Sequence, residues 1–163
     1  MAGHYRLDPL QTEVRFKTRR LFGLAEVTGS VKLREGEITI GAPASATTVS
    51  AVLDADSFNT GLGRRDTRVR SSKFLDTAAF PDIVFTASLV DRTDGEWVAV
   101  GVVTAHGVSA PVDVTVSQIN AALGGEVALH ATATIDRQAH HVSAAWGMAA
   151  RRLDIDITAL ATR

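Results

Sequence analysis

Hydrophobic and polar residues alternate one by one over much of this chain, and this period of two is the pattern of a β-strand. Successive side chains on a strand point to opposite faces, so such a segment turns one face to an interior and the other to water. An α-helix would instead repeat its apolar positions roughly every 3.6 residues. The alternation is found in the ranges 14–17, 49–54, 83–89, 112–117, 126–135 and 152–158.

Further apolar segments and turn signals complete an all-β pattern. The range Trp97–Val103 is apolar on both faces, and strands are also predicted near Tyr5–Leu7 and Val27–Leu33. Turns are predicted at four dipeptides that contain glycine: Glu35-Gly36, Asp94-Gly95, His106-Gly107 and Gly124-Gly125. The chain is therefore expected to form roughly eight or nine strands, mostly joined by hairpins. Closing into a barrel removes the edges of such a sheet, and an eight-stranded barrel holds packed side chains or one small ligand.

Length and composition limit the possible classes of protein. A chain of 163 residues without a linker or repeat predicts one domain, 1–163. The formal charge of −1 argues against nucleic-acid binding, because phosphate contacts need an excess of Lys and Arg. With no cysteine, disulfides and cysteine-ligated zinc are excluded. No secretory signal is visible and no apolar run reaches the ~18 residues of a membrane span, so a cytoplasmic protein without stable membrane insertion is expected.

Several positions on the predicted inner faces hold alanine where a solid core would favour Leu, Ile or Phe. These positions are Ala51, Ala87, Ala131 and Ala133. Small side chains at several inward positions indicate unfilled volume, and an apolar cavity is a natural ligand pocket. The alternative is that Phe and Trp side chains from facing strands fill the space, since barrels often pair small residues with large ones.

Residues with catalytic or metal-binding chemistry form no convincing pattern. His140-His141 is the first metal candidate, with His106 and His130 in reserve, but adjacent residues of an extended segment point in opposite directions. An exposed turn or strand end is the preferred interpretation of that pair. No serine has the glycine pattern of a nucleophile elbow, and Gly61-Leu62-Gly63 is too short for a phosphate-binding loop. The sequence therefore predicts no enzyme, no metal and no cofactor.

The segment 56–85 interrupts the alternation with a dense group of cations, which are Arg64, Arg65, Arg68, Arg70 and Lys73. A short helix is predicted from about Leu62 to Arg70, capped by Thr60, within a helical insertion at about 58–80. Arg64 and Arg68 share a face of that helix and could grip a phosphate. In the alternative, Arg65, Asp66 and Arg70 form salt bridges that hold the insertion on the barrel. The neighbouring phenylalanines are predicted to cover one end of the barrel: Phe58, Phe74 and Phe80.

A series of short motifs follows one order along nearly the whole chain. They are Tyr5-Arg6-Leu7-Asp8-Pro9, 27–31, Ser57-Phe58-Asn59-Thr60-Gly61, 65–76, 80–85, 101–112 and Ile135-Asp136-Arg137. No single motif is specific, but their order and spacing are typical of the YceI-like family of lipid-binding proteins, which this chain resembles.

The resemblance implies an extended antiparallel eight-stranded, lipocalin-like barrel that has a helical insertion and encloses an apolar cavity. It also implies a homodimer. The implied function is the non-enzymatic binding, carriage or storage of a long-chain apolar lipid, such as a polyisoprenoid, a prenylated quinone or a fatty-acid-like chain. The lipid would be the ligand, with no cofactor. The alternative is an enzyme or stress-response factor that acts on an isoprenoid or lipid substrate.

This interpretation assigns expected contacts to the lipid and to its head group. The residues expected to contact the lipid are Phe16, Phe22, Val49, Ala51, Leu53, Phe58, Phe74, Phe85, Ala87, Val100, Val102, Leu129, Ala131 and Ala133. Arg20 and Arg68 stand where the family commonly has histidines, and with Arg65 they are the expected head-group contacts. Arginine at these positions would favour an anionic head such as phosphate over a neutral quinone ring.

Overall fold

The computed structural model describes residues 2–20, 25–72, 74–91, 96–122, 124–140 and 152–163. In these ranges the chain forms nine strands, one α-helix and two short 3-10 helices. The strands are β1 (Gly3–Leu7), β2 (Glu13–Arg20), β3 (Ala25–Ile40), β4 (Thr48–Asn59), β5 (Asp82–Asp91), β6 (Trp97–Ala105), β7 (Val108–Ala122), β8 (Glu126–Asp136) and β9 (Arg152–Thr162). The helices are η1 (Ala44–Ala46), α1 (Gly63–Arg70) and η2 (Arg137–His140).

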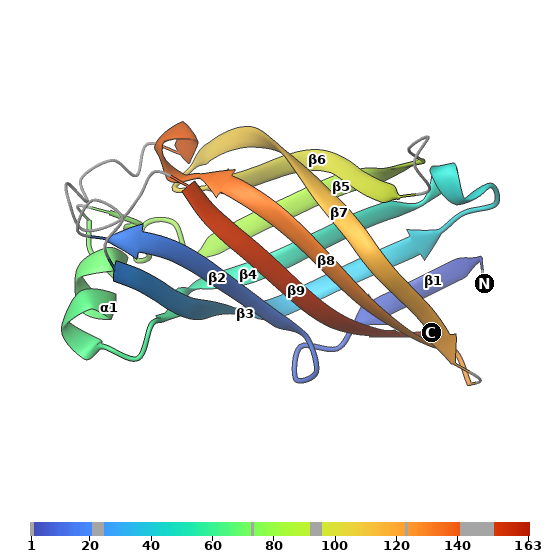
Figure 1. Ribbon diagram of the computed structural model, residues 1–163, viewed down its shortest axis with the longest axis horizontal. Helices are drawn as coiled ribbons and strands as arrows, with labels where there is room; N and C mark the ends of the chain where they lie inside the picture. The colour runs from blue at the N-terminus through green and yellow to red at the C-terminus, as the bar shows by residue number, and fades with distance from the viewer. Residues whose placement is uncertain (1, 21–24, 73, 92–95, 123, 141–151) are drawn as a thin grey trace.

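Strands β2 to β9 form a closed antiparallel barrel in which each strand pairs with its neighbours in sequence (Figure 1). The last strand, β9, pairs with β2, and this pairing closes the sheet. Strand β1 occupies the same barrel position as β2, since it too lies between β3 and β9, but nearer the chain termini. The barrel thus has eight strand positions, one of them shared by β1 and β2. The predicted all-β fold class and the eight-stranded barrel are confirmed.

Two of the predicted turns are confirmed. His106 and Gly107 join β6 to β7 with φ angles of 54° and 71°, which is the backbone of a type I′ hairpin turn. Gly124-Gly125 joins β7 to β8, also at positive φ. Asp94-Gly95 lies outside the described residues.

The turn predicted at Glu35-Gly36 is wrong, because β3 continues through both residues to Ile40. The pairing of β3 with β4 slips between Leu33 and Glu35, so this region is a β-bulge within the strand. Gly36 leaves room for a neighbour, since a Cβ there would lie 2.5 Å from Cδ1 of Leu7. Glycine inside a strand often marks such a close approach instead of a turn.

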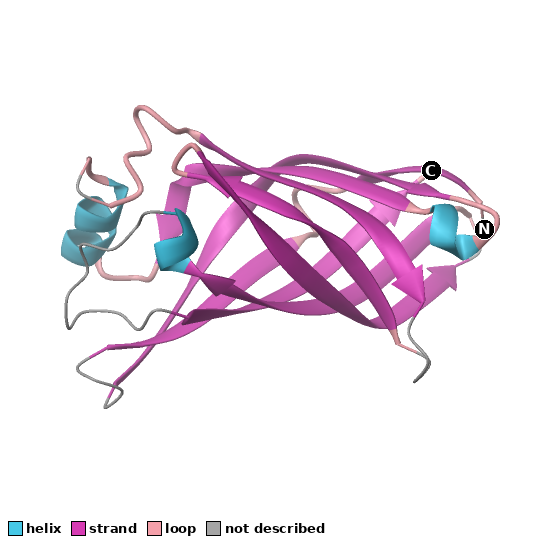
Figure 2. Cartoon of the chain, turned by 90° about the horizontal axis from the view of Figure 1, so that it is seen from above, coloured by secondary structure: helices cyan, strands magenta, loops and turns pink. Residues whose placement is uncertain are grey.

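The helical insertion lies at one end of the long barrel, and both chain termini lie near the other end (Figures 1 and 2). It occupies residues 60–81, close to the predicted range of about 58–80, because β4 extends through Asn59 and β5 begins at Asp82. The predicted helix is confirmed as α1. The predicted cap is wrong: Leu62 is the N-cap residue and makes no side-chain capping bond, whereas Thr60 binds the side chain of Asp66. None of the helices in the described ranges has the length and apolar character needed to cross a membrane.

Candidate functional site

A cavity of about 540 Å³ lies inside the barrel and is lined almost entirely by apolar side chains. All nine described strands contribute to its wall. It extends from Ala44 and Thr47, at the end with the termini, to Leu75 and His140, at the end with α1. Its volume falls within the roughly 300–1,000 Å³ of small-molecule sites in proteins. The predicted apolar cavity is therefore present, and aromatic side chains do not fill it.

Many of the residues expected to contact lipid line this cavity. They are Phe16, Val49, Ala51, Leu53, Phe58, Phe85, Leu129, Ala131 and Ala133. Each occupies an inward-facing position of its strand. Such positions recur every second residue, so the alternation in the sequence predicts them. Ala131 is the most enclosed of the three alanines, with 2% of its surface exposed.

The structure corrects the expected positions of Val100 and Val102. Their side chains are 45% and 40% exposed and do not line the cavity, because the inward face of β6 is formed by Trp97, Ala99 and Val103. The predicted face is wrong because β6 is apolar on both sides, so alternation cannot distinguish its inward face from its outward face. The two valines lie on the outer wall of the barrel.

Three other expected contacts lie elsewhere. Ala87 is buried in the core cluster with Leu89 and Ala99, and it does not line the cavity. Phe74 is also buried outside the lining, with the guanidinium of Arg68 5.7 Å from its ring centroid. Phe22 lies outside the described residues.

The sequence interpretation left out further lining residues, among them Val14, Leu33, Ile38, Ile83, Trp97, Ala99, Val103, Val112, Val114, Ile155 and Ile157. The alternation placed most of them on inner faces, so a signal was present. An inward direction alone, however, does not say whether a side chain meets other side chains or an open volume.

Stacked phenylalanines form part of the cavity wall near α1. The rings of Phe16 and Phe58 lie 5.0 Å apart at an angle of 16°. Gly29 faces Phe16 on the neighbouring strand, and a Cβ there would lie 2.5 Å from Cζ of that ring. Phe80 packs edge-on against His106 at 5.1 Å. Of the phenylalanines predicted to cover this end, Phe58 thus reaches the cavity, while Phe80 packs against the β6–β7 turn.

His140 is one of the few polar side chains in the lining and has only 4% of its surface exposed. The exposed turn expected for it is therefore wrong. Its Nδ1 lies 2.8 Å from the carbonyl of Val108, and Nδ1 of His106 lies 3.0 Å from the carbonyl of His140, so η2 is folded onto the β6–β7 turn. Because a carbonyl only accepts, Nδ1 of His140 is the donor in its contact with Val108. His141 lies outside the described residues.

The arginines of the insertion contact the end of β4. The Nε of Arg65 donates to the hydroxyl of Thr60 at 2.9 Å, and Arg70 donates to the carbonyl of Phe58. The carboxylate of Asp66 accepts the amide of Thr60 at 3.0 Å. These contacts favour the scaffold interpretation of Arg65 and Arg70, with Thr60 and Phe58 as the anchoring partners. The side chain of Arg20 lies outside the described residues.

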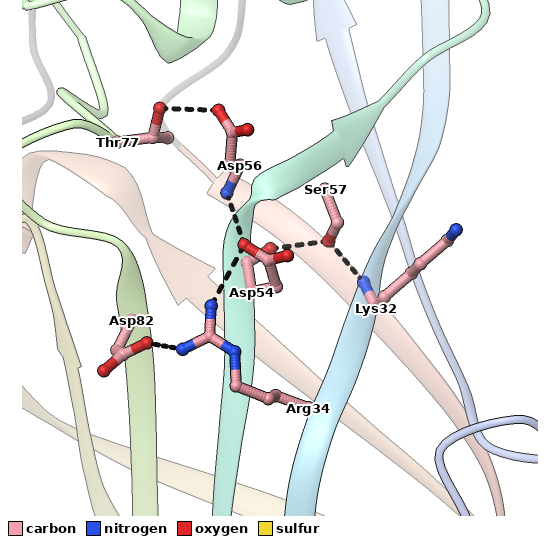
Figure 3. Close-up of polar contacts among 7 residues, drawn as sticks. All are labelled: Lys32, Arg34, Asp54, Asp56, Ser57, Thr77 and Asp82. Carbon is pink, nitrogen blue, oxygen red and sulfur yellow. Dashed lines mark hydrogen bonds and ion pairs between the residues drawn. The ribbon is translucent and has the colours of Figure 1, made fainter.

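A polar network on the outer wall ties the base of the insertion to the sheet (Figure 3). Asp54 and Asp82 face each other on β4 and β5, where two like charges would repel. Arg34 of β3 pairs with both carboxylates, at 3.3 Å from Asp54. Asp56 accepts the hydroxyl of Thr77 at 2.9 Å, which connects the insertion to β4. The network positions the insertion and stays outside the cavity.

A Ser-His-Asp set also lies on the outer wall, where sequence reasoning found no such grouping. The Oγ of Ser117 lies 2.7 Å from Nδ1 of His130, and Nε2 of His130 lies 2.6 Å from Asp156. The three residues come from β7, β8 and β9, so only strand pairing brings them together. His130 and Asp156 are 36% and 54% exposed at their side chains, and none of the three lines the cavity. Their arrangement gives no means of acting on a molecule inside the barrel.

No group of three or more His, Asp or Glu side chains in the described ranges is placed to hold a metal.

Comparison with known proteins places this barrel in a family. The family model of the YceI-like domain matches residues 5–161. The chain belongs to the YceI-like family. Curated relatives named Protein YceI, from Salmonella enteritidis PT4 and Salmonella dublin among others, are 30% identical over 115 residues. That match covers 69% of this chain but 60% of the length of those relatives.

Solved structures share the fold of this YceI-like chain. BcnA of Burkholderia cenocepacia superimposes with a TM-score of 0.83 at 18% identity, covering 96% of this chain and 99% of its own. A polyisoprenoid binding domain from Saccharophagus degradans, implicated in plant cell wall breakdown, gives 0.77 at 15% identity, with 99% of both chains covered. At these identities the likeness extends to the fold alone.

Proposed function

We propose that this YceI-like protein binds a long-chain apolar lipid inside its barrel and carries or stores it without changing it chemically. The observation that supports this most directly is the long cavity with its apolar lining. Burial of an apolar chain contributes about 0.8 kcal/mol per CH₂, so a long tail needs few polar contacts to bind well. The Saccharophagus domain, described as polyisoprenoid binding, favours an isoprenoid chain as the ligand.

The polar head of the lipid belongs at the α1 end in this proposal. There His140 is one of the few polar side chains of the lining and offers a hydrogen-bond partner to a polar head. Contact of an anionic head with Arg20, Arg65 or Arg68 stays a prediction, and Arg65 already binds Thr60. Comparing the retention of a polyprenyl phosphate with that of the matching polyprenyl alcohol decides between the two kinds of head, and equal retention would refute the anionic preference.

Lipid binding is tested by a substitution that places a bulky side chain in the cavity. In Ala133→Phe the new ring enters the cavity and obstructs it, so the protein should lose most of its bound lipid. Lipid is measured by mass spectrometry of organic extracts of protein purified from cells. Thr132→Phe is the matched control, since it adds the same ring to the exposed outer face of the same strand, outside the cavity lining. If wild-type extracts contain no long-chain lipid, or if both variants retain it equally, the proposal fails.

We also propose a homodimer in the cytoplasm. Val90, Val100 and Val102, exposed at 40–46% on the outer walls of β5 and β6, are the apolar residues that favour pairing there. Sedimentation velocity measures the mass of the particle in solution.

A further inference from the structure

Helix α1 concentrates positive charge on a chain that is acidic elsewhere. Its sequence, GRRDTRVR, has four arginines and one aspartate, a formal charge of +3. Since the whole chain carries −1, the remainder carries −4. Asp66, the acid of this helix, is buried and accepts hydrogen bonds from Thr60, whereas Arg64 and Arg68 are exposed. The helix therefore presents a cationic face to solvent.

An exposed apolar residue precedes this cationic face. Leu62 is 49% exposed and lies between Gly61 and Gly63. A Cβ added to either glycine would meet no other atom within 4 Å, so this short segment stands clear of the rest of the described chain. A protruding leucine beside arginines is the composition of segments that lie at membrane surfaces, where apolar side chains enter the interface and cations meet lipid phosphates.

The same insertion forms part of the cavity wall. Phe58, at its root, and Leu75, after the helix, both line the cavity. Arg70 binds the carbonyl of Phe58, so the helix is joined directly to a residue of the wall. Because α1 lies at this end of the barrel, any partner that binds α1 also lies next to this end (Figure 2).

We propose that Leu62, Arg64 and Arg68 form a docking surface that places the α1 end of the barrel on an anionic lipid membrane. The inference rests on the proposed function, because a lipid carrier must collect its ligand from a membrane. Nucleic acid fits this surface less well, because the protruding leucine has no role on a phosphate backbone. Docking is peripheral, with the leucine entering only the interface.

Sedimentation with phosphatidylcholine vesicles, with or without phosphatidylglycerol, tests this surface. An arginine near an anionic surface contributes about 1 kcal/mol, or about fivefold in affinity, so Arg64→Gln/Arg68→Gln should weaken binding to the anionic vesicles by about 25-fold. Arg15→Gln/Lys17→Gln is the matched control. It removes the same charge from exposed side chains on the outer wall of β2 and should change binding by less than about twofold. Added salt should weaken wild-type binding.

Because Arg68 also packs on Phe74, a second variant leaves that contact intact. Leu62→Ser/Arg64→Gln should lose at least about fivefold in vesicle affinity at an unchanged melting temperature. The proposal is overturned if wild-type protein binds neutral and anionic vesicles equally or not at all, or if both α1 variants bind as tightly as the control.

Uptake of a polyprenyl alcohol from detergent micelles separates docking from lipid binding, since it needs no membrane. Both α1 variants should load from micelles like the wild type. Loss of loading in these variants would assign the arginines to the cavity and overturn the docking role. If the wild type itself takes up no alcohol from micelles, the proposed function fails, while vesicle binding still decides the docking surface.

Discussion

Gly101 and Ala87 face each other on the paired strands β6 and β5. A Cβ added to Gly101 would collide with the carbonyl oxygen of Thr86 and lie 2.6 Å from the Cβ of Ala87. Most of these neighbouring atoms belong to the backbone and cannot rotate away. The site therefore requires glycine for space, which explains a glycine in the middle of a long β-strand.

Gly101→Ala should destabilise the barrel by about 1–3 kcal/mol, because the paired strands must move apart to admit one methyl group. The free energy of unfolding is measured by urea denaturation. Gly63→Ala is the matched control: nothing lies within 4 Å of its added Cβ, and alanine favours the helix that begins there. If the two variants unfold at the same urea concentration, β5 and β6 have room to separate and the prediction is wrong.

At the scale of elements, the insertion is held by a few polar contacts to the end of β4. The hydroxyl of Thr60 accepts a hydrogen bond from Arg65, and the amide of Thr60 donates one to Asp66. Arg70 donates a hydrogen bond to the carbonyl of Phe58. In an eight-residue helix without a side-chain cap, little stability comes from the helix itself. These contacts to β4 therefore decide where the helix lies.

Asp66→Ala should release the insertion while leaving the barrel folded. It removes the acceptor of the Thr60 amide, and loss of a buried hydrogen-bond partner costs about 1–3 kcal/mol. Hydrogen exchange should accelerate in residues 60–75 and stay unchanged in β7 and β8.

Glu26→Ala removes a carboxylate from an exposed ion pair with Lys17 and is the control for that experiment. It should change stability by less than about 1 kcal/mol. Uniform acceleration of exchange throughout the Asp66→Ala barrel would contradict a local role for Asp66.

At the scale of the whole molecule, closure of the sheet and the open interior are two consequences of one arrangement. Eight strand positions enclose a space just wide enough for side chains or one ligand, and small residues such as Ala51, Ala131 and Ala133 leave part of it open. An open apolar volume forgoes packing contacts that a ligand can restore. Bound lipid should therefore stabilise the folded barrel.

Removal of the lipid should lower the melting temperature, and adding back a polyprenyl alcohol should restore it. Ligand at 100 times its dissociation constant adds about 2.7 kcal/mol to the folded state. Thermal unfolding followed by circular dichroism measures the shift. Ala133→Phe, in which the ring obstructs lipid binding, should melt at one temperature before and after extraction. A wild-type melting temperature that does not respond to the lipid would show that nothing binds the folded state preferentially.

The strands, the barrel and part of the cavity wall could be predicted from the sequence alone. Alternation is a local property, and burial of one face follows from it directly, as for Phe85 and Leu129. The motifs also identified the family, because they span the same length as the domain. Where the pattern was ambiguous, at β6, it put Val100 and Val102 on the wrong face.

Which residues meet between distant parts of the chain depends on how the barrel folds. The burial of His140 comes from the folding of η2 onto the β6–β7 turn, and the Ser117-His130-Asp156 set comes from the register of three strands. The Glu35-Gly36 dipeptide predicts a turn, because the side chain that needs the space at Gly36, Leu7, is distant in sequence. Such contacts join residues far apart in the chain, and no local pattern records them.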